Sequence, residues 1–162
     1  MKSKKVSTYG LLVALAFILS YIEALFPAPV PIPGIKLGLA NLVVLAALYT
    51  MGVKEAFVLS IIRIILAGFT FGNLSTMLFS LAGGILSWLV MSLLKYFRSF
   101  SQVGVSIAGG VTHNMGQIIV AIFVTENINI IYYFPFLMLS GLISGTVIGI
   151  VGAMIIKRIK KP

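Results

Sequence analysis

The chain has no cysteine and no aspartate, a single histidine, and three acidic residues, all of them glutamate. The missing cysteines exclude disulfides, thiolate metal sites and cysteine nucleophiles. His113 and the glutamates lie in separate segments, which is too sparse a ligand set for a metal cage. No Gly-x-x-x-x-Gly-Lys-[Ser/Thr] phosphate loop is present, so the chain cannot hydrolyse ATP itself. We therefore expect no metal, no cofactor and no catalytic residue.

Charge is scarce throughout. Charged residues make up 9% of the 162 residues and hydrophobic residues 60%, with a mean hydropathy of +1.15. A typical soluble domain is about 25% charged, so the composition predicts an integral membrane protein. A helix crosses the hydrocarbon core in roughly 20 residues, which allows about six crossings and leaves no room for a separate soluble domain.

Breaks in the apolar runs place these crossings. Four prolines interrupt the sequence between Pro27 and Pro33, and Gly52 and Gly72-Asn73 mark two further turns. Strand-like alternation is missing. We expect an all-α membrane protein with one domain over residues 1–162, built of six transmembrane helices at about 6–26, 35–52, 53–71, 74–95, 103–125 and 130–156.

The basic residues predict the orientation, because cytoplasmic flanks retain Lys and Arg during insertion. If the N-terminus is cytoplasmic, every Lys and Arg except Lys36 and Arg63 flanks the cytoplasmic side. We therefore expect a multi-pass protein of the cell membrane with both termini in the cytoplasm. The net charge of +9 then reflects this topology and attraction to anionic lipid, and no nucleic-acid partner is expected. A cleaved signal peptide is a weak alternative, because the first apolar run is too long for a signal core.

Two charged residues within the expected helices lie at membrane depth. Arg63 is near the middle of the third run, and Glu23 is close to the outer end of the first. Buried charges are costly in a membrane unless they are paired or hydrated. Their depths differ by about one helical turn, so we hypothesise that Glu23 and Arg63 interact. Such a pair can be purely structural or can belong to a ligand site.

A polar stripe interrupts the fifth run. His113 and Gln117 are four residues apart, and Asn114 and Gln117 three apart, so these side chains share one helix face. Helix packing is one explanation, since glycine and polar side chains are common at transmembrane contacts. A ligand-lining role is the other.

Arg63 and the polar stripe of the fifth run share their expected membrane depth with Asn41 in the second run. All of them lie between the membrane centre and its outer face. This is where a transporter or receptor pocket is expected, and Arg63 and Lys36 favour an anionic ligand. The Pro-rich segment with Pro31 and Pro33 is a candidate lid, or an ordinary stiff turn. The predicted substrate-binding residues are Glu23, Lys36, Asn41, Arg63, His113, Asn114 and Gln117.

Two segments carry a resemblance to a known family: Pro31-Ile-Pro-Gly-Ile-Lys-Leu-Gly-Leu-Ala-Asn41 and Thr112-His-Asn-Met-Gly-Gln117. They resemble the membrane family labelled heptaprenyl diphosphate synthase component I, also called Gx transporter. The six-helix plan is similar to the S components of energy-coupling factor (ECF) vitamin transporters. A prenyl synthase needs Asp-rich motifs to hold Mg²⁺, so without aspartate we expect no synthase activity.

The resemblance implies a set of partners. An S component is the substrate-binding subunit of an ATP-driven uptake transporter, which also contains a coupling membrane subunit and two cytoplasmic ATPases. It docks through small residues on the first helix, here Gly10 and Ala14, with Ala16 and Ser20 as a second small pair. The expected substrate is a small anionic, isoprenoid-like or vitamin-like molecule. The alternative is a membrane subunit of prenyl diphosphate or quinone metabolism.

Overall fold

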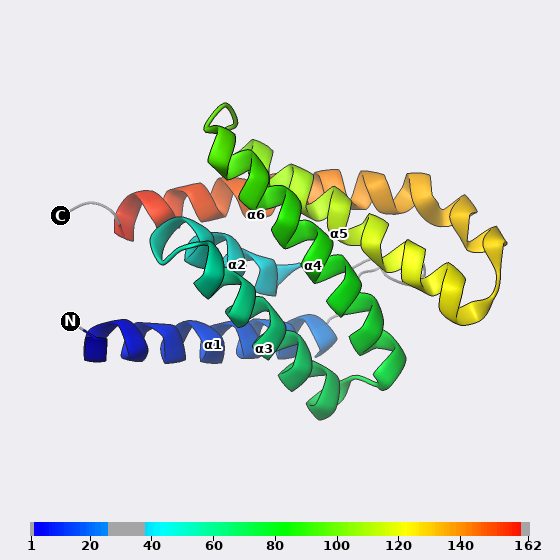
Figure 1. The fold of residues 1–162 in the computed structure, drawn as a ribbon, viewed down its shortest axis with the longest axis horizontal. Helices are drawn as coiled ribbons and strands as arrows, with labels where there is room; N and C mark the ends of the chain where they lie inside the picture. Colours follow the sequence, from blue (N-terminus) through cyan, green and yellow to red (C-terminus); the bar gives the residue numbers. More distant parts are fainter. Residues whose placement is uncertain (1, 26–37, 160–162) are drawn as a thin grey trace.

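The computed structural model describes residues 2–25 and 38–159, and within them the chain is all-helical with no strand. Six α-helices form the bundle, together with one short 3-10 helix, η1 (Figure 1). In chain order they are α1 (Lys2–Leu25), α2 (Leu39–Thr50), α3 (Val53–Phe71), α4 (Leu74–Phe97), α5 (Gln102–Thr125), η1 (Ile128–Tyr133) and α6 (Phe134–Ile159). The expectation of an all-α fold is confirmed for these residues.

Local sequence signals account for where several helices begin. Asn73 starts α4 with a capping box, in which its side chain accepts a hydrogen bond from the Thr76 backbone N–H at 2.8 Å. Ser101 caps α5 in a similar way through the Gly104 N–H. The last helix begins at Phe134 rather than near residue 130, because Pro135 fits the first helical turn, where its missing N–H is not needed.

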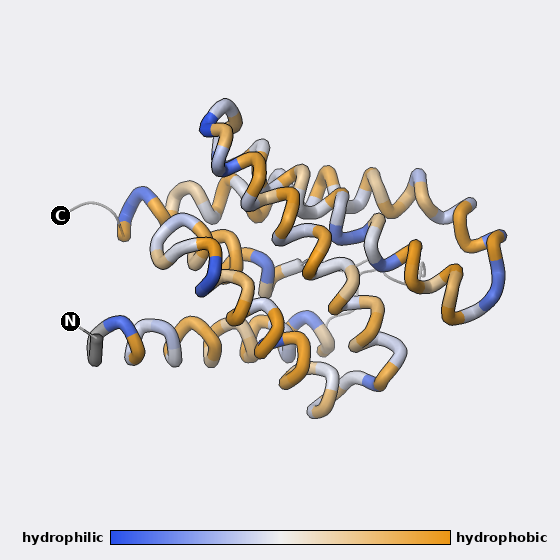
Figure 2. Tube along the Cα trace, viewed as in Figure 1, coloured by the Kyte–Doolittle hydropathy of each residue, from blue (hydrophilic) through white to orange (hydrophobic). Residues whose placement is uncertain are grey.

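Among the described residues, four helices are long and apolar enough to cross a membrane, judged by length and composition: α1, α4, α5 and the η1–α6 segment. In the described chain α2 has only 12 residues, or about 18 Å of helix. Within its 19 residues, α3 carries Lys54, Glu55 and Arg63. Apolar residues dominate most helices, as Figure 2 shows. The structure thus shows a helical protein with membrane-type helices, and six crossings remain a prediction.

Glycine lets α5 and α6 approach until their backbones touch. A Cβ placed on Gly141 would lie 2.8 Å from the Gly110 carbonyl oxygen, and one on Gly145 would lie 2.7 Å from Ile107 Cα. Gly116 makes a similar approach to α4, where its Cβ would lie 2.8 Å from the Ala82 carbonyl oxygen. Such close packing is how membrane helices gain contact area. Helices α4, α5 and α6 therefore form a tightly joined unit.

Helix α1 packs on α2 and α3, and α2 also packs on α6. The start of α1, the α2–α3 turn and the end of α6 lie at one end of the bundle, and η1 lies at the other (Figure 1). An apolar cluster fills the half nearer the termini and includes Leu45, Leu48, Leu59, Val105 and Ile156. The polar residues discussed below lie in the other half.

Candidate functional site

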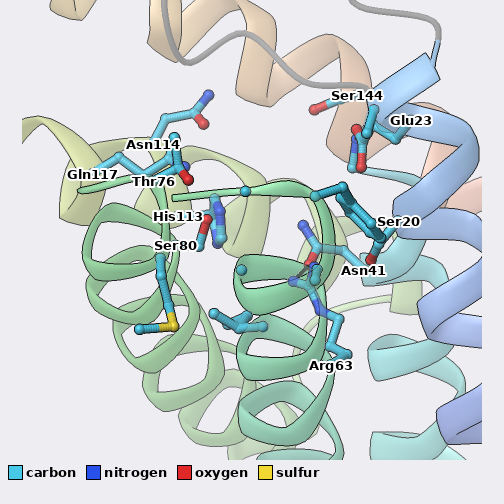
Figure 3. A pocket seen from close by; sticks show the side chains of 18 of the residues that line it. Ser20, Glu23, Asn41, Arg63, Thr76, Ser80, His113, Asn114, Gln117 and Ser144 are labelled. Atoms are coloured by element: carbon cyan, nitrogen blue, oxygen red, sulfur yellow. Dashed lines mark hydrogen bonds between the residues drawn. The ribbon is translucent and has the colours of Figure 1, made fainter. Parts of the chain in front are cut away.

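A cavity of about 320 Å³ lies in the half of the bundle away from the termini (Figure 3). Every α-helix contributes to its wall, from the end of α1 to the first half of α6. Its volume is within the range of small-molecule sites, about 300 to 1,000 Å³. The polar residues on its wall are Ser20, Glu23, Asn41, Arg63, Thr76, Ser80, His113, Asn114, Gln117 and Ser144.

Arg63 reaches the cavity from α3 and is held by α2. Its Nη2 donates a hydrogen bond to Asn41 Oδ1 at 2.7 Å, drawn as a dashed line in Figure 3. Its Nε is buried and has no hydrogen-bond partner among the described residues. An unpartnered donor on a buried cation is costly, so this guanidinium retains capacity to bind a ligand.

Glu23 lies on the same wall but does not contact Arg63 directly. Its Oε1 accepts a hydrogen bond from the backbone N–H of Gly38, which has a left-handed φ of 73° at the start of α2. Helix starts have N–H groups without helical partners, and the carboxylate satisfies one of them. Within the part of the chain that the structure describes, Lys5–Glu55 is the ion pair that forms, and Glu23 acts on Arg63 only through space. The hypothesised direct contact is thus replaced by two separate contacts to α2.

The stripe on α5 serves two purposes. Asn114 is buried, and its Nδ2 donates to the Leu137 carbonyl of α6 at 2.6 Å, which is a packing contact. Gln117 is 8% exposed, and no described residue hydrogen-bonds its Oε1. His113 also lines the cavity. Packing therefore explains Asn114, whereas the Gln117 amide oxygen is buried without a partner among the described residues, which packing alone does not explain.

The sequence reasoning missed the hydroxyl residues Thr76, Ser80 and Ser144, and it did not assign Ser20 to the site. Hydroxyls in helices often bond to a carbonyl of the preceding turn, as Ser20 Oγ does to the Ala16 carbonyl at 2.9 Å. For that reason a serine or threonine in a helical sequence gives little indication of a ligand site. Thr76 and Ser80 are four residues apart on α4, a spacing that places them on one face and was the available clue.

Two sets of predicted residues lie elsewhere. Lys36 and the candidate lid with Pro31 and Pro33 fall outside the described residues. Gly10 and Ala14 are exposed on α1 and do not line the cavity. Ala16 and Ser20, the other small pair, are buried. Of the two pairs, only Gly10 and Ala14 are therefore accessible on the outer surface of the bundle.

The described residues contain no cluster of three or more His, Cys, Asp or Glu side chains placed to hold a metal ion.

Comparison with known proteins gives one match. A family model described as heptaprenyl diphosphate synthase component I covers residues 12–155, which includes every described cavity residue. No curated protein and no solved structure matches the chain.

Proposed function

The chain belongs to the heptaprenyl diphosphate synthase component I family, and from this premise we propose that it is a substrate-binding membrane subunit, the S component of an ECF-type uptake transporter. The observation that carries the proposal is the cavity, about 320 Å³ in volume and walled by all six α-helices. Ionisable residues inside apolar bundles are expensive and usually functional. Here Arg63 and Glu23 share one cavity wall without neutralising each other directly.

The distribution of charge supports uptake rather than export. Lys95, Lys157 and Arg158 lie in the last turns of α4 and α6, near the end of the bundle that holds both termini. With that end in the cytoplasm, the cavity lies in the outer half of the membrane. The subunit then takes its substrate from outside the cell and releases it inward.

Transport needs an energy source that this sequence does not encode, because it has no nucleotide-binding phosphate loop. Two cytoplasmic ATPases and a coupling membrane subunit supply it in the proposed assembly. The exposed small residues Gly10 and Ala14 on α1 support close helix-to-helix docking with the coupling subunit.

The family description favours a second candidate, a membrane subunit associated with prenyl diphosphate or quinone metabolism. A synthase needs carboxylate clusters for Mg²⁺, and this sequence has no aspartate. Under this alternative the chain assists a catalytic partner rather than performing the reaction.

Ligand binding tests the carrier proposal. Purified protein is screened by thermal unfolding against vitamins, flavins, amino acids and prenyl diphosphates. A ligand at one hundred times its Kd stabilises the protein by about 2.7 kcal/mol. Ser80→Phe fills part of the cavity and is expected to abolish the stabilisation, whereas Ser75→Phe, on an exposed face of the same helix, preserves it.

Uptake separates the two candidates. Cells that express the chain with a coupling subunit and its ATPases should accumulate the radiolabelled hit, and Ser80→Phe should prevent this. If loss of the chain instead lowers membrane prenyl diphosphate synthesis while uptake is unchanged, the carrier proposal is wrong and the second candidate stands.

A further inference from the structure

The described residues place one positive and one negative charge on the cavity wall. Among the described lining residues Arg63 is the one cation of fixed charge and Glu23 the one carboxylate. They are not in direct contact, because Arg63 is bonded to Asn41 and Glu23 to the Gly38 backbone. A purely anionic ligand is attracted by one group and repelled by the other. This balance is that of Arg63 and Glu23, since Lys36 lies outside the described residues, and it differs from the anionic preference expected from Arg63 and Lys36.

Each charged group also keeps binding capacity. A carboxylate can accept about four hydrogen bonds and a guanidinium can donate five, and among the described residues Glu23 and Arg63 each make one side-chain hydrogen bond. The Nε of Arg63 has no partner among the described residues. Gln117, at 8% exposure, adds a buried amide oxygen that no described residue satisfies. The cavity is therefore equipped for a polar ligand with charges of both signs.

We propose, on the basis of the carrier function above, that the substrate is a compact zwitterion of the amino-acid type. Its anionic group binds Arg63 and its ammonium group binds Glu23, while a polar group elsewhere on the molecule pairs with the Gln117 amide. Figure 3 supports this arrangement: Glu23, Asn41 and Arg63 lie on one side of the cavity, and Gln117, His113 and Ser80 on the other.

The size and charge of the cavity argue against a long prenyl diphosphate. The volume of about 320 Å³ lies at the lower end of the range for small-molecule sites, about 300 to 1,000 Å³. A chain of seven isoprene units is too large for such a cavity to enclose. A diphosphate also carries several negative charges, which Glu23 repels and Arg63 alone does not balance.

The test uses matched ligands on the wild-type protein, so it does not depend on any variant folding. Each of the proteinogenic amino acids is compared with its N-acetyl and its carboxamide derivative, with farnesyl diphosphate alongside, by thermal unfolding and titration. At least one amino acid should bind, and each derivative, which loses one charge, should bind about 10- to 100-fold more weakly. Equal binding of the N-acetyl derivative, preference for farnesyl diphosphate, or no binding by any amino acid overturns the zwitterion proposal.

Single variants test which side chain binds each charged group of the ligand. Glu23→Gln should weaken zwitterion binding and bring the N-acetyl derivative to similar affinity, because it removes the repulsion. Arg63→Gln should weaken both ligands, and Arg63→Lys should retain part of the binding. Glu126→Gln and Arg98→Gln are the matched controls, since both residues are exposed helix C-caps away from the cavity. If Glu23→Gln changes neither affinity, the ammonium assignment is wrong.

The two proposals fail in different ways. Uptake of a simple anion that is blocked by Ser80→Phe contradicts the zwitterion and leaves the carrier function intact. Binding of an amino acid without any uptake in the presence of the coupling module contradicts the carrier function instead.

Discussion

Arg63 Nη2 donates to Asn41 Oδ1 at 2.7 Å, and this hydrogen bond joins α3 to α2 at the cavity wall. Two consecutive helices, joined at their other ends by a short turn, are thereby held together beside a buried cation. Hydrogen bonds to charged groups are worth about 1.5 to 3 kcal/mol, more than neutral ones. The hydrogen bond thus stabilises the packing of α2 on α3 and also forms part of the candidate site.

Asn41→Leu removes the acceptor and leaves Nη2 without this partner. The ligand-free protein should lose about 1 to 3 kcal/mol of stability, the cost of an unsatisfied buried polar group. Thermal unfolding in detergent measures the loss. Asn129→Leu, on the exposed side of η1, is the control and should stay within about 0.5 kcal/mol of wild type. An unchanged Asn41→Leu protein would show that the hydrogen bond contributes nothing.

Gln117→Leu should separate stability from binding. The leucine removes a buried amide oxygen that lacks a described partner, so ligand-free stability should be unchanged or higher by up to about 1 to 3 kcal/mol. Ligand-induced stabilisation should fall, because the amide no longer pairs with the ligand. Gln102→Leu at the start of α5 provides the comparison. A variant that loses stability but binds normally would assign Gln117 to packing alone.

Gly145→Ala should destabilise the bundle. The added Cβ would lie 2.7 Å from Ile107 Cα, and a backbone atom cannot move aside as a side chain can. Overpacking of this kind costs about 1 to 3 kcal/mol. Gly10→Ala is the matched substitution, since its Cβ meets nothing within 4 Å and alanine favours helix, so its stability should be equal or slightly higher. Equal unfolding temperatures for the two variants would contradict the close contact of α5 and α6.

The double variant Gly10→Leu/Ala14→Leu tests docking on α1. Both residues are exposed, so the isolated subunit should unfold at nearly the wild-type temperature. Affinity purification from cells that co-express the coupling subunit should recover much less of that subunit, because bulky side chains prevent close helix approach. Ser75→Leu on α4 serves as the control. Full recovery with the double variant would place the docking surface elsewhere.

Composition and depth predicted much of the fold and the grouping of the site residues. Helical rise put Asn41, Arg63 and Gln117 at a similar depth, the shared helix face added His113 and Asn114, and all five line one cavity in the structure. Depth does not fix the rotation of a helix about its axis, however. This is why Glu23 was expected to contact Arg63, when the Gly38 N–H at the start of α2 is its partner.

The hydroxyl residues were not predictable for another reason. Ser80 and Thr76 look the same in sequence whether they pack, cap or bind, and Thr76 does cap, since its hydroxyl accepts from the Asn73 N–H at 3.0 Å. Only the position of α4 relative to α3 and α5 shows that both face the cavity. Charged residues are informative in a membrane because they are costly there, and hydroxyls are not.

The apolar cluster near the termini forms a floor for the cavity, because it fills the bundle between the cavity and the end that holds both termini. Leu45, Leu48, Leu59, Val105 and Ile156 offer no hydrogen bond to a polar solute, and the first three are at most 1% exposed. A hydrophilic molecule in the cavity therefore cannot diffuse straight onward through this floor. Under the proposed carrier function, delivery to the far side therefore requires the helices to part or the whole protein to turn.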